Sequence, residues 1–234
     1  GNGMVGDGCT ACVVDAGFDC TGAPSECDPT HRDGQSFFLV DLSDDVRTID
    51  RVPCVVPDVA GDCSLRDALT FAETGDTIQF SAAVFTASPL RPIFIDGSLG
   101  PLPPVAQGTL TIEGDWERVI IDGTGAPAGS DGLVVTSSNN VIGGLTLRHF
   151  EGDGLVIESG ANNTLGSCSY GALHLRNRFV FNDGYGLAIR GETADGNRVG
   201  GNFVGSDYWH LTGANGGGLI IEAGPDNTTL GCNP

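Results

Sequence analysis

The chain has 234 residues, of which 40% are hydrophobic, enough for one sizeable domain with a small appendage. Thirty acidic residues against 11 basic ones give a formal net charge of −19, so nucleic acid and anionic membrane surfaces are poor partners. No apolar stretch reaches the about 18 residues of a membrane-spanning helix, so we expect no membrane insertion. Glycine accounts for 37 of the 234 residues, about twice its usual share of about 7%. This excess favours a turn-rich all-β fold.

Eight cysteines indicate an oxidising, secreted or cell-surface location. Half of them lie near the N-terminus, with almost no apolar residues to build a core: Cys9, Cys12, Cys20 and Cys27. Cys9-x-x-Cys12 also fits a zinc or redox motif, but the neighbouring residues are Asp and Gly without His. We therefore favour disulfides among these four, of open connectivity, and predict a cysteine-rich segment over residues 1–33.

This segment resembles a known kind of repeat. The phrases Gly6-Asp7-Gly8-Cys9, Gly17-Phe18-Asp19-Cys20 and Pro24-Ser25-Glu26-Cys27 are similar to the end of a myxobacterial-type cysteine-rich repeat. The family repeat has two further cysteines before this point. The resemblance therefore implies that the native polypeptide continues upstream.

Residues 34–76 are predicted to form a cap for the domain that follows. Ser64 and Asp67 have the spacing of a capping box and predict a helix over residues 65–73 with one apolar face. Such a helix can cover an open first coil. For Arg66 we expect a structural role, pairing with the acidic loop or the cap backbone.

Two further features of the cap involve side-chain chemistry. Cys54 and Cys63 flank a short loop and are predicted to form a disulfide. The Asp-rich loop offers a possible calcium site, with these candidate ligands: Asp41, Asp44 and Asp45. No other cofactor is expected.

The cap also carries a family resemblance. The run Cys63-Ser64-Leu65-Arg66-Asp67-Ala68-Leu69 is similar to the "CSLREA" motif of secreted parallel β-helix proteins, with Asp in place of Glu. The resemblance implies a secreted parallel β-helix with this helix at its N-terminal end.

The region 77–234 contains repeated strand phrases. Four apolar segments come first, at 77–80, 93–96, 109–112 and 119–122. A Gly-aliphatic phrase then starts at Gly132, Gly154, Gly186 and Gly218, at spacings of 22, 32 and 32 residues. A second phrase follows each one, at 140–144, 163–166, 197–201 and 228–231. Repeats at this period, with no helix between them, predict a right-handed parallel β-helix from about residue 77 onward.

A coil of about 22 residues has room for three strands and three turns. We expect inward aliphatic side chains to stack from coil to coil and the recurring asparagines to form a hydrogen-bonded ladder. The longer spacings indicate excursions at 166–176 and 204–215. The second carries a loop that could contact sugars: Tyr208, Trp209 and His210.

Catalysis is the less favoured interpretation. A hydrolase-like or lyase-like site would need clustered carboxylates with basic residues. The local match is Asp153 and Asp183 with His174, Arg176 and Arg178 nearby, but Asn-Asp-Gly and Gly-Asp-Gly are also ordinary turn sequences. We expect a structural or adhesive extracellular module with no catalytic site, and keep a carbohydrate-binding or carbohydrate-active β-helix as the alternative.

The predicted end of the solenoid bears on partners. The chain stops just after a strand phrase, and a solenoid needs a cap there, so we expect further coils, neighbouring domains or end-to-end self-association to cover it. A head-to-tail contact would yield a filament. Cys168 and Cys232, placed two coils or roughly 10 Å apart by strand spacing, are expected to be free or to form intermolecular bonds.

Overall fold

The computed structural model describes residues 37–47, 54, 62–86, 89–206, 213–222 and 227–232, with the backbone of four short strands nearer the N-terminus. These strands form two antiparallel pairs: β1 (Cys9–Thr10) with β2 (Val13–Val14), and β3 (Asp19–Thr21) with β4 (Glu26–Asp28). The predicted disulfides among the first four cysteines lie outside the described side chains.

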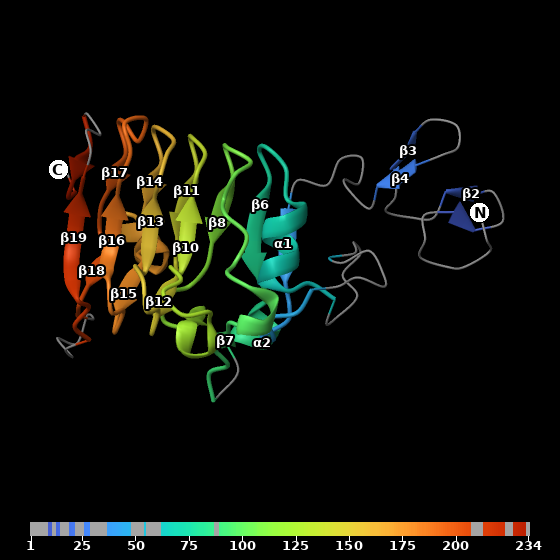
Figure 1. The fold of residues 1–234 in the computed structure, drawn as a ribbon, viewed down its shortest axis with the longest axis horizontal. Coiled ribbons are helices and arrows are strands. Elements are labelled where there is room, and N and C mark those ends of the chain that lie inside the picture. Colours follow the sequence, from blue (N-terminus) through green and yellow to red (C-terminus); the bar gives the residue numbers. More distant parts are fainter. Residues whose placement is uncertain are drawn as a thin grey trace.

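Parallel strands in three sheets make up most of the fold (Figure 1). The seven-stranded sheet contains, in chain order, β5 (Phe37–Val40), β6 (Thr77–Phe80), β8 (Thr111–Glu113), β11 (Val141–Gly143), β14 (Thr164–Leu165), β17 (Arg198–Val199) and β20 (Thr229–Leu230). The five-stranded sheet contains β7 (Ile93–Phe94), β9 (Ile120–Asp122), β12 (Thr146–Arg148), β15 (Arg178–Val180) and β18 (Phe203–Val204). The four-stranded sheet contains β10 (Leu133–Val135), β13 (Leu155–Ile157), β16 (Tyr185–Ile189) and β19 (Gly217–Ile221).

From β8 onward the chain visits these sheets in rotation. β8, β9 and β10 make one circuit of the seven-, five- and four-stranded sheets, and β11, β12 and β13 make the next. Within each sheet, neighbours along the stack pair in parallel. The fold is therefore dominated by parallel strands with few helices, as predicted, and the rotation fits a β-helix.

Inward side chains stack from circuit to circuit. In the seven-stranded sheet the register places Ile112, Ile142, Leu165 and Val199 in one column, and all four are buried. Neighbouring strands lie about 4.8 Å apart, so each side chain fills the space between two others. One circuit alone could not bury its apolar side, and stacking is what creates the core.

A ladder of buried asparagines joins successive circuits at the corner before the seven-stranded sheet. Asn163 Oδ1 accepts hydrogen bonds from Asn140 N at 2.9 Å and Asn140 Nδ2 at 2.8 Å. Asn197 Oδ1 accepts from Asn163 N at 2.8 Å. This confirms the predicted ladder, which ends where Thr228 takes the next position.

The other two corners have ladders that the sequence analysis did not identify. Asn177 N donates to Asn202 Oδ1 at 2.9 Å before the five-stranded sheet. Asn182 N donates to Asn215 Oδ1 at 3.0 Å before the four-stranded sheet. All three corners are thus held by side-chain amides that bind the backbone of an adjacent circuit.

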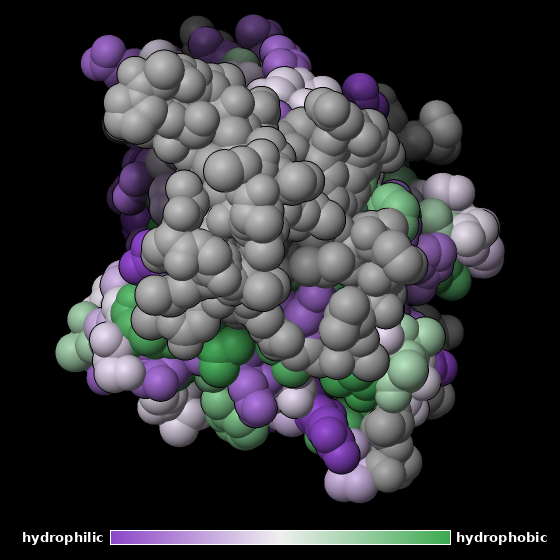
Figure 2. Space-filling view, turned by 90° about the vertical axis from the view of Figure 1, so that its right-hand side faces the viewer, coloured by the Kyte–Doolittle hydropathy of each residue, from purple (hydrophilic) through white to green (hydrophobic). Residues whose placement is uncertain are grey.

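Helix α1 (Leu65–Phe71) lies at the N-terminal end of the sheets and packs against β5 (Figure 1). Ser64 Oγ accepts from Asp67 N at 3.0 Å, as the capping box predicts. The helix ends two residues earlier than predicted, because Ala72 is extended and Glu73 N donates to Asp76 Oδ2 at 2.8 Å instead. Figure 2 views this end, where hydrophilic and hydrophobic side chains are interspersed around the rim.

The other helices among the described residues are short. They are α2 (Ala82–Phe85) and the 3₁₀ segments η1 (Gly97–Leu99), η2 (Gly123–Gly125) and η3 (Tyr170–Leu175). η3 is bent at Ala172 and lies in the first predicted excursion, between β14 and β15. In the described part of the chain no helix is long and apolar enough to cross a membrane.

Candidate functional site

The cap is fixed by a buried ion pair between Arg66 and Asp45. Arg66 Nε and Nη2 donate to Asp45 Oδ1 and Oδ2, both at 2.7 Å. The guanidinium also donates to the backbone carbonyls of residues 99–101, at 3.4, 2.9 and 2.7 Å. The predicted structural role of Arg66 is confirmed, because its donors are engaged by the acidic loop and the backbone.

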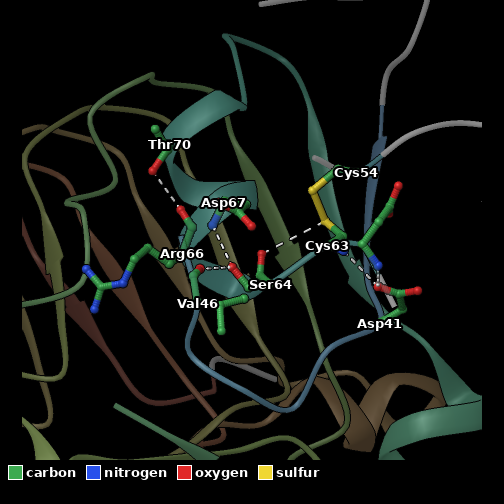
Figure 3. The surroundings of a disulfide bond; sticks show 9 residues. Asp41, Val46, Cys54, Cys63, Ser64, Arg66, Asp67 and Thr70 are labelled. Carbon is green, nitrogen blue, oxygen red and sulfur yellow. Dashed lines mark hydrogen bonds between the residues drawn. A yellow bond between two sulfur atoms is a disulfide. The ribbon is translucent and has the colours of Figure 1, made fainter. Parts of the chain in front are cut away.

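The predicted disulfide between Cys54 and Cys63 is confirmed, and it lies next to Ser64 at the start of α1 (Figure 3). Asp41 Oδ1 accepts from Asp62 N at 3.1 Å and from Cys63 N at 2.9 Å, which holds one end of the disulfide loop against β5. Both cysteines are buried. Cys54, Asp62 and Cys63 are therefore tied both to the residue that follows β5 and to the start of α1.

The three carboxylates considered for calcium face different partners. Asp45 is engaged by Arg66 and Asp41 by backbone N–H groups, whereas Asp44 is exposed. Among the residues that the structure describes, no group of three or more His, Cys, Asp or Glu could hold a metal ion. Calcium binding at this loop is therefore not supported by a preformed site and stays a prediction.

A second disulfide joins Cys168 to Cys232 within the chain, so the prediction that these cysteines are free or intermolecular is wrong. Their Cα atoms lie 5.3 Å apart. Cys168 belongs to the excursion after β14, and the disulfide crosses over Gly200 of the intervening circuit, where a Cβ atom would collide with Cys168 Sγ. The spacing between strands does not predict the distance to Cys168, because this residue lies in the excursion beyond the end of a strand.

The last circuit exposes side chains that are core residues everywhere else. Leu230 stacks on the buried Val199 but is 53% exposed, and Ile221 stacks on the buried Ile189 but is 37% exposed. β18, β19 and β20 are also the terminal strands of their sheets in the described part of the chain. At this end of the described stack, two core columns are therefore left open to solvent.

The carboxylates considered for a hydrolase-like or lyase-like site serve other contacts. Asp153 Oδ1 accepts from Tyr185 N at 2.7 Å, and its Oδ2 pairs with Arg190 Nη1 at 2.5 Å. Asp183 is exposed at the corresponding corner of the next circuit. His174 and Arg176 lie elsewhere, along a groove outside the five-stranded sheet.

Asp153 has a carboxylate neighbour on the preceding circuit. Asp131 Oδ1 accepts from Asp153 N at 2.6 Å. Burial raises the pKa of Asp131 and the charge of Asp153 raises it further, against the lowering effects of that hydrogen bond and of Arg190. These aspartates bind the backbone of the next circuit as the asparagine ladders do, and Arg190 extends the network to Glu222 at 2.9 Å.

A groove lies where two segments fold over the outer face of the five-stranded sheet. Trp116 N donates to His174 O at 3.4 Å and Thr146 Oγ1 donates to Trp116 O at 2.6 Å, so the turn before β9 and η3 meet over β12. Beside them is a cavity of about 280 Å³ lined in part by Trp116, Arg176 and Phe203. A second cavity of about 290 Å³ shares Asp115 and His174 with it, so the two cavities are neighbours.

This groove was not predicted from the sequence, because Trp116 and Phe203 are far apart in the chain and only the fold brings their rings together. The loop that the sequence predicted to contact sugars lies outside the described residues: Tyr208, Trp209 and His210.

No protein-family model matches the chain, and no curated protein matches it.

Proposed function

We propose that this chain is a right-handed parallel β-helix that serves as a secreted structural or adhesive module, extended end to end by a neighbour. The rotation of the chain through three parallel sheets supports the β-helix. Crossovers between parallel strands are right-handed in about 98% of cases, which supports the handedness.

The open end of the stack is the observation that carries the proposal. Leu230 and Ile221 project along columns that are buried in every earlier circuit, and β18, β19 and β20 offer strand edges in all three sheets at once. Covering a half-exposed Leu or Ile gains about 1 kcal/mol, and each edge can add backbone hydrogen bonds. A unit with matching strands, either another copy or a neighbouring domain, fits this surface.

Two further features support a secreted location. Disulfides persist mainly in oxidising compartments, and the chain has two in its described part. The run from Cys63 to Leu69 also resembles the motif of secreted β-helix proteins, and its Arg66 and Ser64 make the cap contacts described above.

Light scattering and electron microscopy of the purified chain over a range of concentrations test the proposal. We expect concentration-dependent association, with elongated particles. Leu230→Lys should suppress association because it places a charge on the open end. Val141→Lys is the matched control, since Val141 is 40% exposed on the flank of β11. A wild-type chain that stays monomeric when concentrated, or association that survives Leu230→Lys, would refute extension by a second copy of this chain.

A carbohydrate-binding role is the second candidate function. The groove over the five-stranded sheet is the observation that favours it.

A further inference from the structure

The groove over the five-stranded sheet combines aromatic rings with an incompletely bonded arginine. The Trp116 and Phe203 ring centroids are 5.2 Å apart, and the Arg176 guanidinium lies 5.6 Å from the centroid of Phe203. Arg176 Nε is buried and has no hydrogen-bond partner in the described part of the chain. Nε itself is closed off from the groove, but the Arg176 side chain is only partly buried and lines the groove, so the Nη donors of its guanidinium can meet an acceptor that enters beside Phe203.

Groups of opposite polarity surround these rings. Asp115 and Glu117 contribute acceptors to the lining of the groove, whereas His174 and Arg176 contribute donors. Asp115 Oδ2 is already paired with Arg118 Nε at 3.1 Å, and both side chains remain partly exposed. The groove therefore presents an apolar surface flanked by both hydrogen-bond donors and acceptors, which is the usual composition of a small-molecule site.

This combination selects among ligand classes. A polyanion would be repelled by the carboxylates of Asp115 and Glu117 and by the net charge of −19. A purely apolar ligand would desolvate charged groups without pairing them. A neutral sugar has C–H faces that pack on aromatic rings and hydroxyls that both donate and accept.

We propose that this groove binds a short neutral oligosaccharide. One sugar ring packs against Phe203 beside Trp116 and gives a hydroxyl oxygen to Arg176. The chain of sugars continues past Asp115 and His174 into the adjoining cavity beside Arg118. This binding is independent of end-to-end association, because the open end lies on other residues.

Calorimetric titration of the whole chain with cellohexaose, xylohexaose and chitohexaose, and with hexagalacturonate as the charged counterpart, tests the proposal. We expect at least one neutral oligosaccharide to bind and hexagalacturonate not to. Arg176→Ala should weaken binding about tenfold, the equivalent of one lost hydrogen bond to a charged donor. Phe203→Leu, which keeps an apolar side chain and removes the ring, should also weaken it.

Phe181→Ala is the matched control. Phe181 is 45% exposed and stacks on His149 at 5.5 Å, and it does not line the groove. Circular dichroism of each variant should match that of the wild type. Binding by Phe181→Ala should be unchanged.

Tryptophan fluorescence locates the site, because the chain has only two tryptophans, Trp116 and Trp209. In Trp209→Phe the remaining signal comes from Trp116, and the bound oligosaccharide should still change it. Failure of all three neutral oligosaccharides to bind would overturn the proposal. So would binding that withstands both groove substitutions, or binding that disappears in Trp209→Phe.

Discussion

Removing one amide from the asparagine ladder should destabilise the whole stack, and Asn163→Ala is the sharpest case. Asn163 is buried, and its Oδ1 accepts from both the backbone N–H and the side-chain Nδ2 of Asn140. Its own Nδ2 donates to Gly160 O at 3.1 Å. The substitution removes all three hydrogen bonds without touching the aliphatic columns.

The cost follows from what each former partner retains. Asn140 Nδ2 still donates to Ser137 O and Oγ, both at 3.0 Å, and Gly160 O still accepts from Asn197 Nδ2 at 3.4 Å. The backbone N–H of Asn140 loses its acceptor, Asn163 Oδ1, and becomes the orphaned donor. One orphaned buried donor costs about 1–3 kcal/mol and each of the other two lost bonds about 1 kcal/mol, so we expect a loss of about 3–5 kcal/mol.

Urea unfolding followed by circular dichroism measures this loss. The matched control is Asn162→Gly, one residue away, since Asn162 is exposed and has a φ of 59°, which glycine adopts readily. It should change the unfolding free energy by less than about 0.5 kcal/mol. If Asn163→Ala were as stable as Asn162→Gly, the ladder would not be a main stabilising element.

Three other predictions follow from the structure. A mild thiol reductant should reduce the exposed Cys168–Cys232 disulfide before the buried Cys54–Cys63 disulfide, and alkylation followed by mass spectrometry measures the order. Simultaneous reduction would show that exposure does not decide which disulfide is reduced first. Arg66→Ala should cost about 3–5 kcal/mol in urea unfolding because it leaves a buried carboxylate unpaired, and a loss below about 1 kcal/mol would refute the role of this ion pair. Asp131→Asn should raise the urea midpoint at neutral pH, because a folded-state pKa above the unfolded value of about 3.9 means that ionisation weakens folding. The difference in urea midpoint between Asp131→Asn and the wild type should shrink as the pH falls from the folded-state pKa of Asp131 toward its unfolded-state value. A difference that does not change with pH would contradict this reasoning.

Most strands of the seven- and four-stranded sheets could be predicted, because short apolar segments there are bounded by Gly, Asn or Asp turn residues. The phrases beginning at Gly132 and Asn140 contain β10 and β11, with bounds shifted by one residue or two. The strands β12, β15 and β18 in the five-stranded sheet were not located. Their first residues are Thr146, Arg178 and Phe203, which follow no shared pattern, so periodicity gives no signal there.

Features that depend on the path of the excursions could not be predicted. The distance between Cys168 and Cys232 was taken from strand spacing, but Cys168 lies beyond the end of β14, where the chain bends toward the last circuit. The groove depends on η3 lying across the turn that contains Trp116. Contacts of this kind join residues from different circuits and leave no local sequence pattern.

Hydrogen–deuterium exchange of the backbone amides at the open end tests the proposed end-to-end extension most directly. The N–H groups of Thr229 and Gly231 bond to β17, so Leu230 in β20 carries the amide available to a neighbour. We predict that exchange at β19 and β20 slows as the protein concentration rises, while exchange in β11 stays constant, and that Leu230→Lys removes this dependence. Exchange at β19 and β20 that is the same in dilute and concentrated solution would contradict end-to-end association.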